Sequence, residues 1–105
     1  MSWEITPAEL RARLDKGDDL QLVDVREAEE LKIATLGALH IPLTDLVMRH
    51  TELDPDKETV LICHHGIRSA QATMLLSQLG FEKAKNLKGG IDRWSQEVDP
   101  AVPRY

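Results

Sequence analysis

The side chains that could do chemistry gather in one short segment, Cys63-His64-His65-Gly66-Ile67-Arg68-Ser69. Cys63 is the chain's one cysteine, so it has no disulfide partner within the chain. Free cysteines are often small hydrophobic residues of a protein core. A nucleophilic cysteine instead needs a stabilised thiolate, because an ordinary thiol has a pKa of about 8.5 and positive surroundings lower it to about 3.5–7.5.

Three neighbours of Cys63 favour a reactive thiol over a structural one. Gly66 allows a tight turn that exposes backbone N–H groups. Arg68 brings a permanent cation, and no other permanently charged side chain lies between Thr59 and Phe81. Ser69 is predicted to cap the following helix and to add a hydroxyl donor. A core would not need the cation, whereas an anion-binding pocket would.

The elements around this segment would position it. Residues 59–63 are apolar and β-branched, which predicts a buried strand, and residues 68–79 predict a helix that ends at Gly80. A strand followed by a tight loop and a helix points N–H groups and the positive helix end into the bend. A second predicted strand, 20–25, brings Asp24 and Arg26 to the same edge, because ligands bind beyond the carboxyl ends of parallel strands.

Strands and helices alternate along the rest of the chain. Thr6, Pro7 and Glu9 form a helix start, and that helix ends at Gly17. Further helices are predicted over 27–33, over 44–50 and from 91 onward, further strands over 38–41 and 83–87, and an irregular tail from residue 99. The alternation predicts an α/β fold with a mainly parallel sheet. A length of 105 residues predicts one domain, 1–105.

Charge and composition limit the partners and the compartment. The net charge of −5 argues against nucleic acid or an acidic membrane surface as a partner. The acidic excess lies in residues 1–58, whereas residues 59–105 carry a small basic excess that would attract small anions. No apolar run approaches the roughly 18 residues that span a bilayer, and no signal-peptide pattern is visible. With one cysteine, the sequence predicts a cytoplasmic protein.

Four segments, in this order, resemble a rhodanese domain, the sulfurtransferase family. They are Leu22-Val23-Asp24-Val25-Arg26, Gly37-Ala38-Leu39-His40-Ile41-Pro42, the segment from Cys63 to Ser69, and Leu87-Lys88-Gly89-Gly90-Ile91-Asp92-Arg93-Trp94. The resemblance covers nearly the whole chain and implies a parallel five-stranded sheet flanked by helices on both faces. The chain departs from the family at Ala34-Thr35-Leu36, where Gly-His-Ile is frequent, and at Ile91, where an aromatic residue is frequent.

The resemblance implies that Cys63 accepts a sulfane sulfur from a small anionic donor such as thiosulfate and becomes a persulfide. The sulfur then passes to an acceptor, which is cyanide or a thiol, including a thiol on another protein. Arg68 would bind the donor's oxyanion. The outer sulfur would lie among the residues from His64 to Ser69, with the two histidines at the rim. The proposed supporting residues are Asp24 and Arg26 beside the loop, and Arg49 reaching the mouth from its short helix. No cofactor and no metal are required.

Other functions remain open at this point. A sulfur carrier or a regulatory binding module would keep the loop without turnover. A cysteine phosphatase or arsenate reductase also uses Cys and Arg in such a loop, but four residues separate Cys63 from Arg68, one fewer than in those enzymes. A metal site could draw on Cys63 and on the four histidines, His40, His50, His64 and His65. Adjacent loop residues rarely converge on one tetrahedral ion, and no Cys-x-x-Cys spacing is present.

Overall fold

The computed structural model describes residues 3–105, and its centre is a sheet of five strands in the order β1-β5-β4-β2-β3. Every strand pair is parallel. The strands are β1 (Glu4–Ile5), β2 (Leu20–Asp24), β3 (Leu39–His40), β4 (Glu58–Ile62) and β5 (Ala84–Leu87). The predicted α/β fold with a parallel five-stranded sheet is therefore confirmed.

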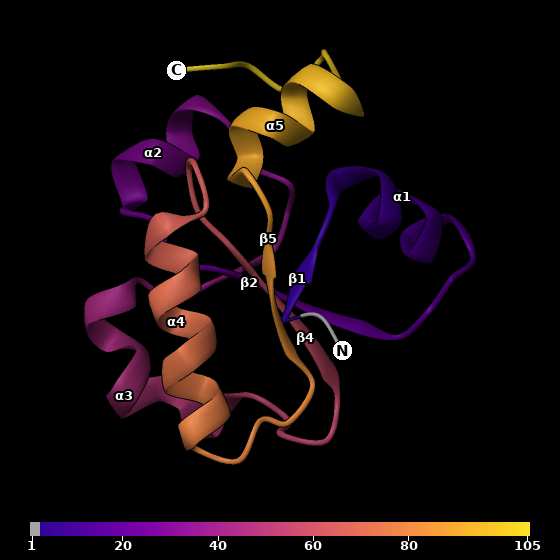
Figure 1. The fold of residues 1–105 in the computed structure, drawn as a ribbon. Coiled ribbons are helices and arrows are strands. Elements are labelled where there is room, and N and C mark those ends of the chain that lie inside the picture. Colours follow the sequence, from indigo (N-terminus) through magenta and orange to yellow (C-terminus); the bar gives the residue numbers. More distant parts are fainter. Residues whose placement is uncertain (1–2) are drawn as a thin grey trace.

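Helices cover both faces of the sheet, as expected (Figure 1). Helices α3 (Leu46–Arg49) and α4 (Ile67–Gln78) lie on one face, and α1 (Pro7–Asp15) and α5 (Gly90–Glu97) lie on the other. Helix α2 (Ala28–Ile33) lies near the end of the sheet at which α4 begins. The helix predicted over 44–50 is broken: α3 keeps one turn, between the 3-10 turns Leu43–Asp45 and His50–Glu52.

Successive side chains along each strand point to opposite faces of the sheet, so the hydrophobic core is divided into two clusters, one on each face. Val23 and Leu61 point toward α3 and α4, where they pack with Leu76. Val60 and Ile62 point to the opposite face, where they pack with residues of α1 and α5. Because β2 and β4 are central and covered on both faces, the loops that follow them start from a rigid platform.

Two helix starts show how local sequence determines the chain's path. Helix α1 begins as predicted, with Thr6 and Glu9 exchanging side-chain and backbone hydrogen bonds of 3.1 and 2.9 Å. Helix α4 begins differently from the prediction. Its N-cap is Gly66, which has a φ of +99°, so Ser69 lies inside the first turn and does not cap the helix.

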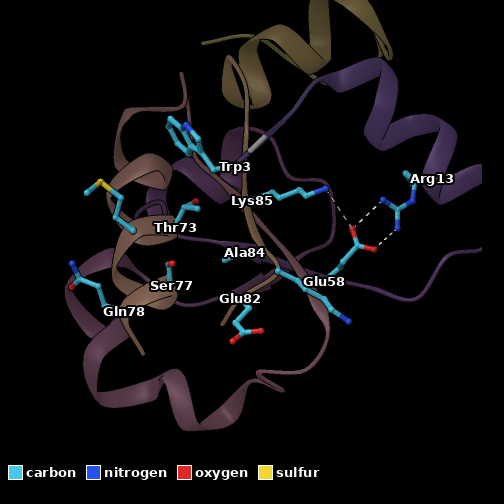
Figure 2. A pocket seen from close by; sticks show the side chains of 11 residues that line it. Trp3, Arg13, Glu58, Thr73, Ser77, Gln78, Glu82, Ala84 and Lys85 are labelled. Atoms are coloured by element: carbon cyan, nitrogen blue, oxygen red, sulfur yellow. Dashed lines mark hydrogen bonds and ion pairs between the residues drawn. The ribbon is translucent and has the colours of Figure 1, made fainter. Parts of the chain in front are cut away.

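A groove of about 650 Å³ lies between α4 and β5, away from the segment that follows β4 (Figure 2). Trp3 and Met74 are the exposed apolar side chains in its wall, and Lys85, Glu58 and Arg13 form an ionic group at one side. Within residues 3–105, no helix combines the length and the apolar character needed to cross a bilayer.

Candidate active site

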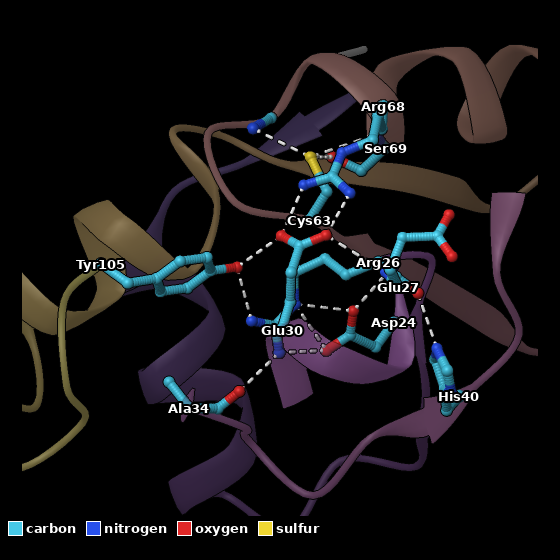
Figure 3. Close-up of polar contacts among 11 residues, drawn as sticks. Asp24, Arg26, Glu27, Glu30, Ala34, His40, Cys63, Arg68, Ser69 and Tyr105 are labelled. Carbon is cyan, nitrogen blue, oxygen red and sulfur yellow. Dashed lines mark hydrogen bonds and ion pairs between the residues drawn. The ribbon is translucent and has the colours of Figure 1, made fainter. Parts of the chain in front are cut away.

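Cys63 follows β4 directly and lies at the bottom of the loop that leads into α4. Its side chain is 1% exposed. The sulfur accepts hydrogen bonds from the backbone N–H groups of Gly66 at 3.1 Å and of Ser69 at 3.3 Å. It also lies 3.1 Å from the Ser69 hydroxyl oxygen (Figure 3). Helix α4 therefore begins with N–H groups that face the sulfur, an arrangement that stabilises negative charge there.

Helix α5 fixes the opposite side of the loop. The Ile91 N–H donates to the carbonyl of Cys63 at 2.9 Å, and the Asp92 N–H donates to the carbonyl of His64 at 3.1 Å. The first N–H groups of a helix have no partners within that helix, so these carbonyls satisfy them. With its carbonyls turned toward α5, the loop is free to turn other N–H groups toward the sulfur.

Gly90 allows this close approach, and Gly90→Ala is expected to disrupt it. A Cβ atom at Gly90 would lie 2.5 Å from the Cys63 carbonyl oxygen and 2.4 Å from that of His64. We expect a loss of about 1–3 kcal/mol in the free energy of unfolding from this overlap. Urea unfolding measures this loss. Gly17→Ala is the matched control, because Gly17 also has positive φ but open space around its Cβ position; equal losses in the two variants would contradict this account.

Arg68 is engaged by a residue that the sequence analysis did not single out. Its guanidinium makes two hydrogen bonds, of 2.5 and 2.8 Å, to the carboxylate of Glu30 on α2. The Tyr105 hydroxyl donates to the same carboxylate at 2.7 Å. The hydrogen bonds from Arg68 are the main cause that lowers the pKa of Glu30 to about 2. The cation predicted to bind a donor is thus already paired in this structure.

Asp24 and Arg26 form a fully buried ion pair beside this group. Their closest contact is 2.7 Å, and neither side chain is exposed. Arg26 also donates to the carbonyl of Ala34 and to the hydroxyl of Tyr105, both at 2.8 Å. The pair is therefore not a solvated surface contact. It ties the end of β2 to the tail of the chain and lies next to Glu30 in Figure 3.

The tail returns to the loop and places Tyr105 against it. The Tyr105 ring stacks on His64 with centroids 3.8 Å apart, and His64 stacks on His65 at the same distance. Burial is the main cause that lowers the pKa of His64, and the positive charge that neighbouring His65 can carry lowers it further. The His64 ring is therefore neutral at neutral pH. The irregular tail was predicted, but its position over the loop was not.

Arg49 does not reach the loop that holds Cys63, so the prediction that it lies at the mouth of the site is wrong. Its guanidinium pairs with Glu52 and Asp45 on its own helical segment. Two histidines of the possible metal set also lie elsewhere. His40 contacts the Arg26 carbonyl, and His50 contacts the Val47 carbonyl.

One group of potential metal ligands occurs among residues 3–105: His64, His65 and Asp92, with ligand atoms within 4.8 Å of one another. Cys63 is not among them. The two imidazoles are stacked, so their nitrogen lone pairs run side by side rather than toward one point. The Asp92 carboxylate already accepts a hydrogen bond of 2.9 Å from Arg104. This donor set does not fit a tetrahedral ion.

Comparison with known proteins agrees with the geometry of the loop. The family model described as the rhodanese-like domain matches residues 6–97. The chain belongs to the rhodanese family. The matched range contains Cys63, Arg68 and Glu30, and it ends before Tyr105 and the tail that carries it.

Similar proteins match this rhodanese domain over nearly its full length. YtwF of Bacillus subtilis is 38% identical over 98 residues, covering 92% of this chain and 94% of YtwF. A sulfurtransferase of Allochromatium vinosum is 35% identical and covers 94% of each chain. A rhodanese-related protein of Thermoplasma volcanium has a TM-score of 0.84 at 35% identity, over 95% of this chain and 96% of that one. Some relatives are longer, and the chain spans 26% of one from Mycobacterium tuberculosis.

Proposed function

We propose that this rhodanese domain transfers a sulfane sulfur through a persulfide on Cys63. The observation that carries the proposal is the convergence of the Gly66 and Ser69 N–H groups on the Cys63 sulfur. Full-length similarity to a sulfurtransferase supports it. Thiosulfate is the proposed donor, and cyanide or a thiol is the proposed acceptor.

The chemistry requires a thiolate and a place for the transferred atom. The Cys63 thiolate attacks the outer sulfur of thiosulfate, a new S–S bond forms, and the donor's S–S bond breaks with its electron pair leaving on sulfite. The acceptor then attacks the outer sulfur of the persulfide and releases the Cys63 thiolate. Within residues 3–105, the N–H groups of His65, Ile67 and Arg68 have no acceptor, so they are available to the anionic outer sulfur.

The experiment offers the protein thiosulfate and cyanide and follows thiocyanate. We expect continuous turnover, and no hydrolysis of p-nitrophenyl phosphate under the same conditions. One equivalent of sulfur bound without turnover would instead identify a carrier. Phosphate release without thiocyanate would favour the phosphatase alternative and overturn the proposal.

The Arg68–Glu30 pair bears on how well an anionic donor binds. Because Glu30 holds both outer nitrogens of the guanidinium, a donor's oxyanion competes with a carboxylate that is always present. Glu30→Gln removes the competing charge and leaves a side chain of the same size. We expect the KM for thiosulfate to fall about tenfold, corresponding to about 1.4 kcal/mol in binding. Steady-state kinetics at constant ionic strength measure this change.

Tyr105→Phe is the matched control for this prediction. It removes the Tyr105 hydroxyl from the Glu30 carboxylate while the Arg68–Glu30 pair stays in place. The KM for thiosulfate should therefore change little. A rise in KM in Glu30→Gln would mean that Glu30 positions Arg68 for the donor rather than competing with it.

A further inference from the structure

Tyr105 holds the tail of the chain against both α2 and the loop that contains Cys63. Its ring stacks on His64 with an angle of 4° between the two ring planes, so the rings are nearly parallel. Its hydroxyl donates to the Glu30 carboxylate at 2.7 Å and accepts from the Arg26 guanidinium at 2.8 Å. Tyr105 therefore joins the loop, through His64, to α2 and to the residue that follows β2.

The contacts of Tyr105 complete a closed circuit of side chains at this loop. Two hydrogen bonds join Arg68 to Glu30, and one joins Glu30 to Tyr105. Stacking then joins Tyr105 to His64. Arg68 and His64 belong to the same loop, near its two ends, so the circuit closes. We call these four side chains the frame; in Figure 3 the Glu30 carboxylate lies between the Arg68 guanidinium and the Tyr105 hydroxyl.

The other sides of Cys63 are occupied by the elements of the fold, and its side chain is only 1% exposed. Strand β4 ends directly before it, N–H groups at the start of α4 face its sulfur, and the Ile91 N–H of α5 donates to its carbonyl. A reactant therefore reaches the sulfur through the frame. Arg68 and Glu30 lie on helices, whereas Tyr105 lies in no helix or strand and is 36% exposed. Tyr105 is thus the member of the frame that can leave without disturbing the fold.

We propose that Tyr105 is a specificity-determining residue, which limits the size of the reactant that can reach the Cys63 sulfur. The inference deepens the proposed sulfur transfer and rests on it for its meaning. A small anion such as thiosulfate or cyanide enters once the Arg68 guanidinium turns from Glu30 toward it. A thiol on the surface of another protein needs a wider opening, which forms only when Tyr105 leaves His64. While the tail is in place, it favours small acceptors over protein thiols.

Alkylation by two reagents that share one reactive group measures this size limit. Iodoacetamide is the small reagent, and iodoacetamidofluorescein is the bulky one. Because the chain has a single cysteine, both reagents report on Cys63. At one pH they meet the same fraction of thiolate, so a change in the ratio of their rate constants between variants reports access to the sulfur and not its ionisation.

Tyr105→Ala removes the aromatic ring and leaves both partners of the Arg68–Glu30 pair in place. Minor conformations of proteins are typically populated at about 0.1–10%, so making the opened one permanent should raise the rate with the bulky reagent at least about tenfold. The rate with iodoacetamide should change little, because this reagent does not need Tyr105 to leave. A rise of the same size with both reagents, or no change with either, would overturn the proposal.

Trp3→Ala is the matched control for the loss of an exposed aromatic ring. Trp3 is 51% exposed, but it lines the groove between α4 and β5, so the ratio of the two rates should stay at the wild-type value. Thermal unfolding checks that both variants fold. If Tyr105→Ala does not fold, Tyr105→Leu keeps an apolar side chain of smaller size at this position. The same preferential rise with the bulky reagent is expected for it.

The alkylation test is independent of the proposed function, because it requires no sulfur donor. If thiocyanate formation fails while Tyr105→Ala admits the bulky reagent, the proposed function is wrong and the limit on access stands. If thiocyanate forms but the ratio of the two rates is the same in the wild type and in Tyr105→Ala, the size limit alone is wrong.

Discussion

Cys63→Ser is expected to abolish sulfur loading completely. The intact wild-type protein should gain the mass of about one sulfur atom after incubation with thiosulfate, and dithiothreitol should reverse the gain. The variant should gain nothing, because a serine hydroxyl is a far weaker nucleophile and the chain has no other cysteine. Mass spectrometry of the intact protein measures both results.

The variant should fold like the wild type, because serine is close to cysteine in size and meets N–H groups and a hydroxyl at this position. Thermal unfolding provides that control. If a folded Cys63→Ser protein still gained one sulfur atom, the sulfur would be held outside the loop. The persulfide mechanism would then be wrong.

Asp24→Ala is expected to cause the largest loss of stability. Both members of the Asp24–Arg26 pair are fully buried, so removal of the carboxylate leaves a guanidinium without a counter-charge. Breaking a buried pair in this way costs about 3–5 kcal/mol, a large part of the roughly 5–15 kcal/mol that stabilises a typical domain. Urea unfolding measures the difference in the free energy of unfolding between the variant and the wild type, with one common m value fitted to both curves.

The chain offers a matched control in the pair between Arg49 and Glu52. That pair has similar contacts, with a shortest distance of 2.9 Å, but both side chains are well exposed. Glu52→Ala should change the free energy of unfolding little, because exposed ion pairs contribute little to stability. Similar losses in the two variants would show that burial is not what makes the Asp24–Arg26 pair important.

The sequence was sufficient for features that depend on neighbours along the chain. The apolar run before Cys63 and the glycine after it predicted the strand, the bend and the helix that follows. The cap of α1 also followed from local spacing. Strand β1 was missed because its two residues are too short for a periodic pattern, and it forms only by pairing with Asn86 and Leu87.

The missed residues of the site depend on contacts distant in sequence. Glu30 resembles any acid in the first turn of a helix, and only the fold brings it to Arg68. Tyr105 follows an irregular tail whose path no local pattern specifies. Ser69 was predicted as a cap because serine favours that position, but the positive φ of Gly66 starts the helix earlier and turns Ser69 toward the sulfur.

The hydrogen bonds from α5 to the carbonyls of Cys63 and His64 have a consequence for biosynthesis. The residues that shape the loop from behind are translated well after the cysteine itself. The loop can therefore take the shape described above only after residues 89–92 have been made and have packed against it. The geometry around Cys63 belongs to the folded domain and not to the segment from Cys63 to Ser69 alone.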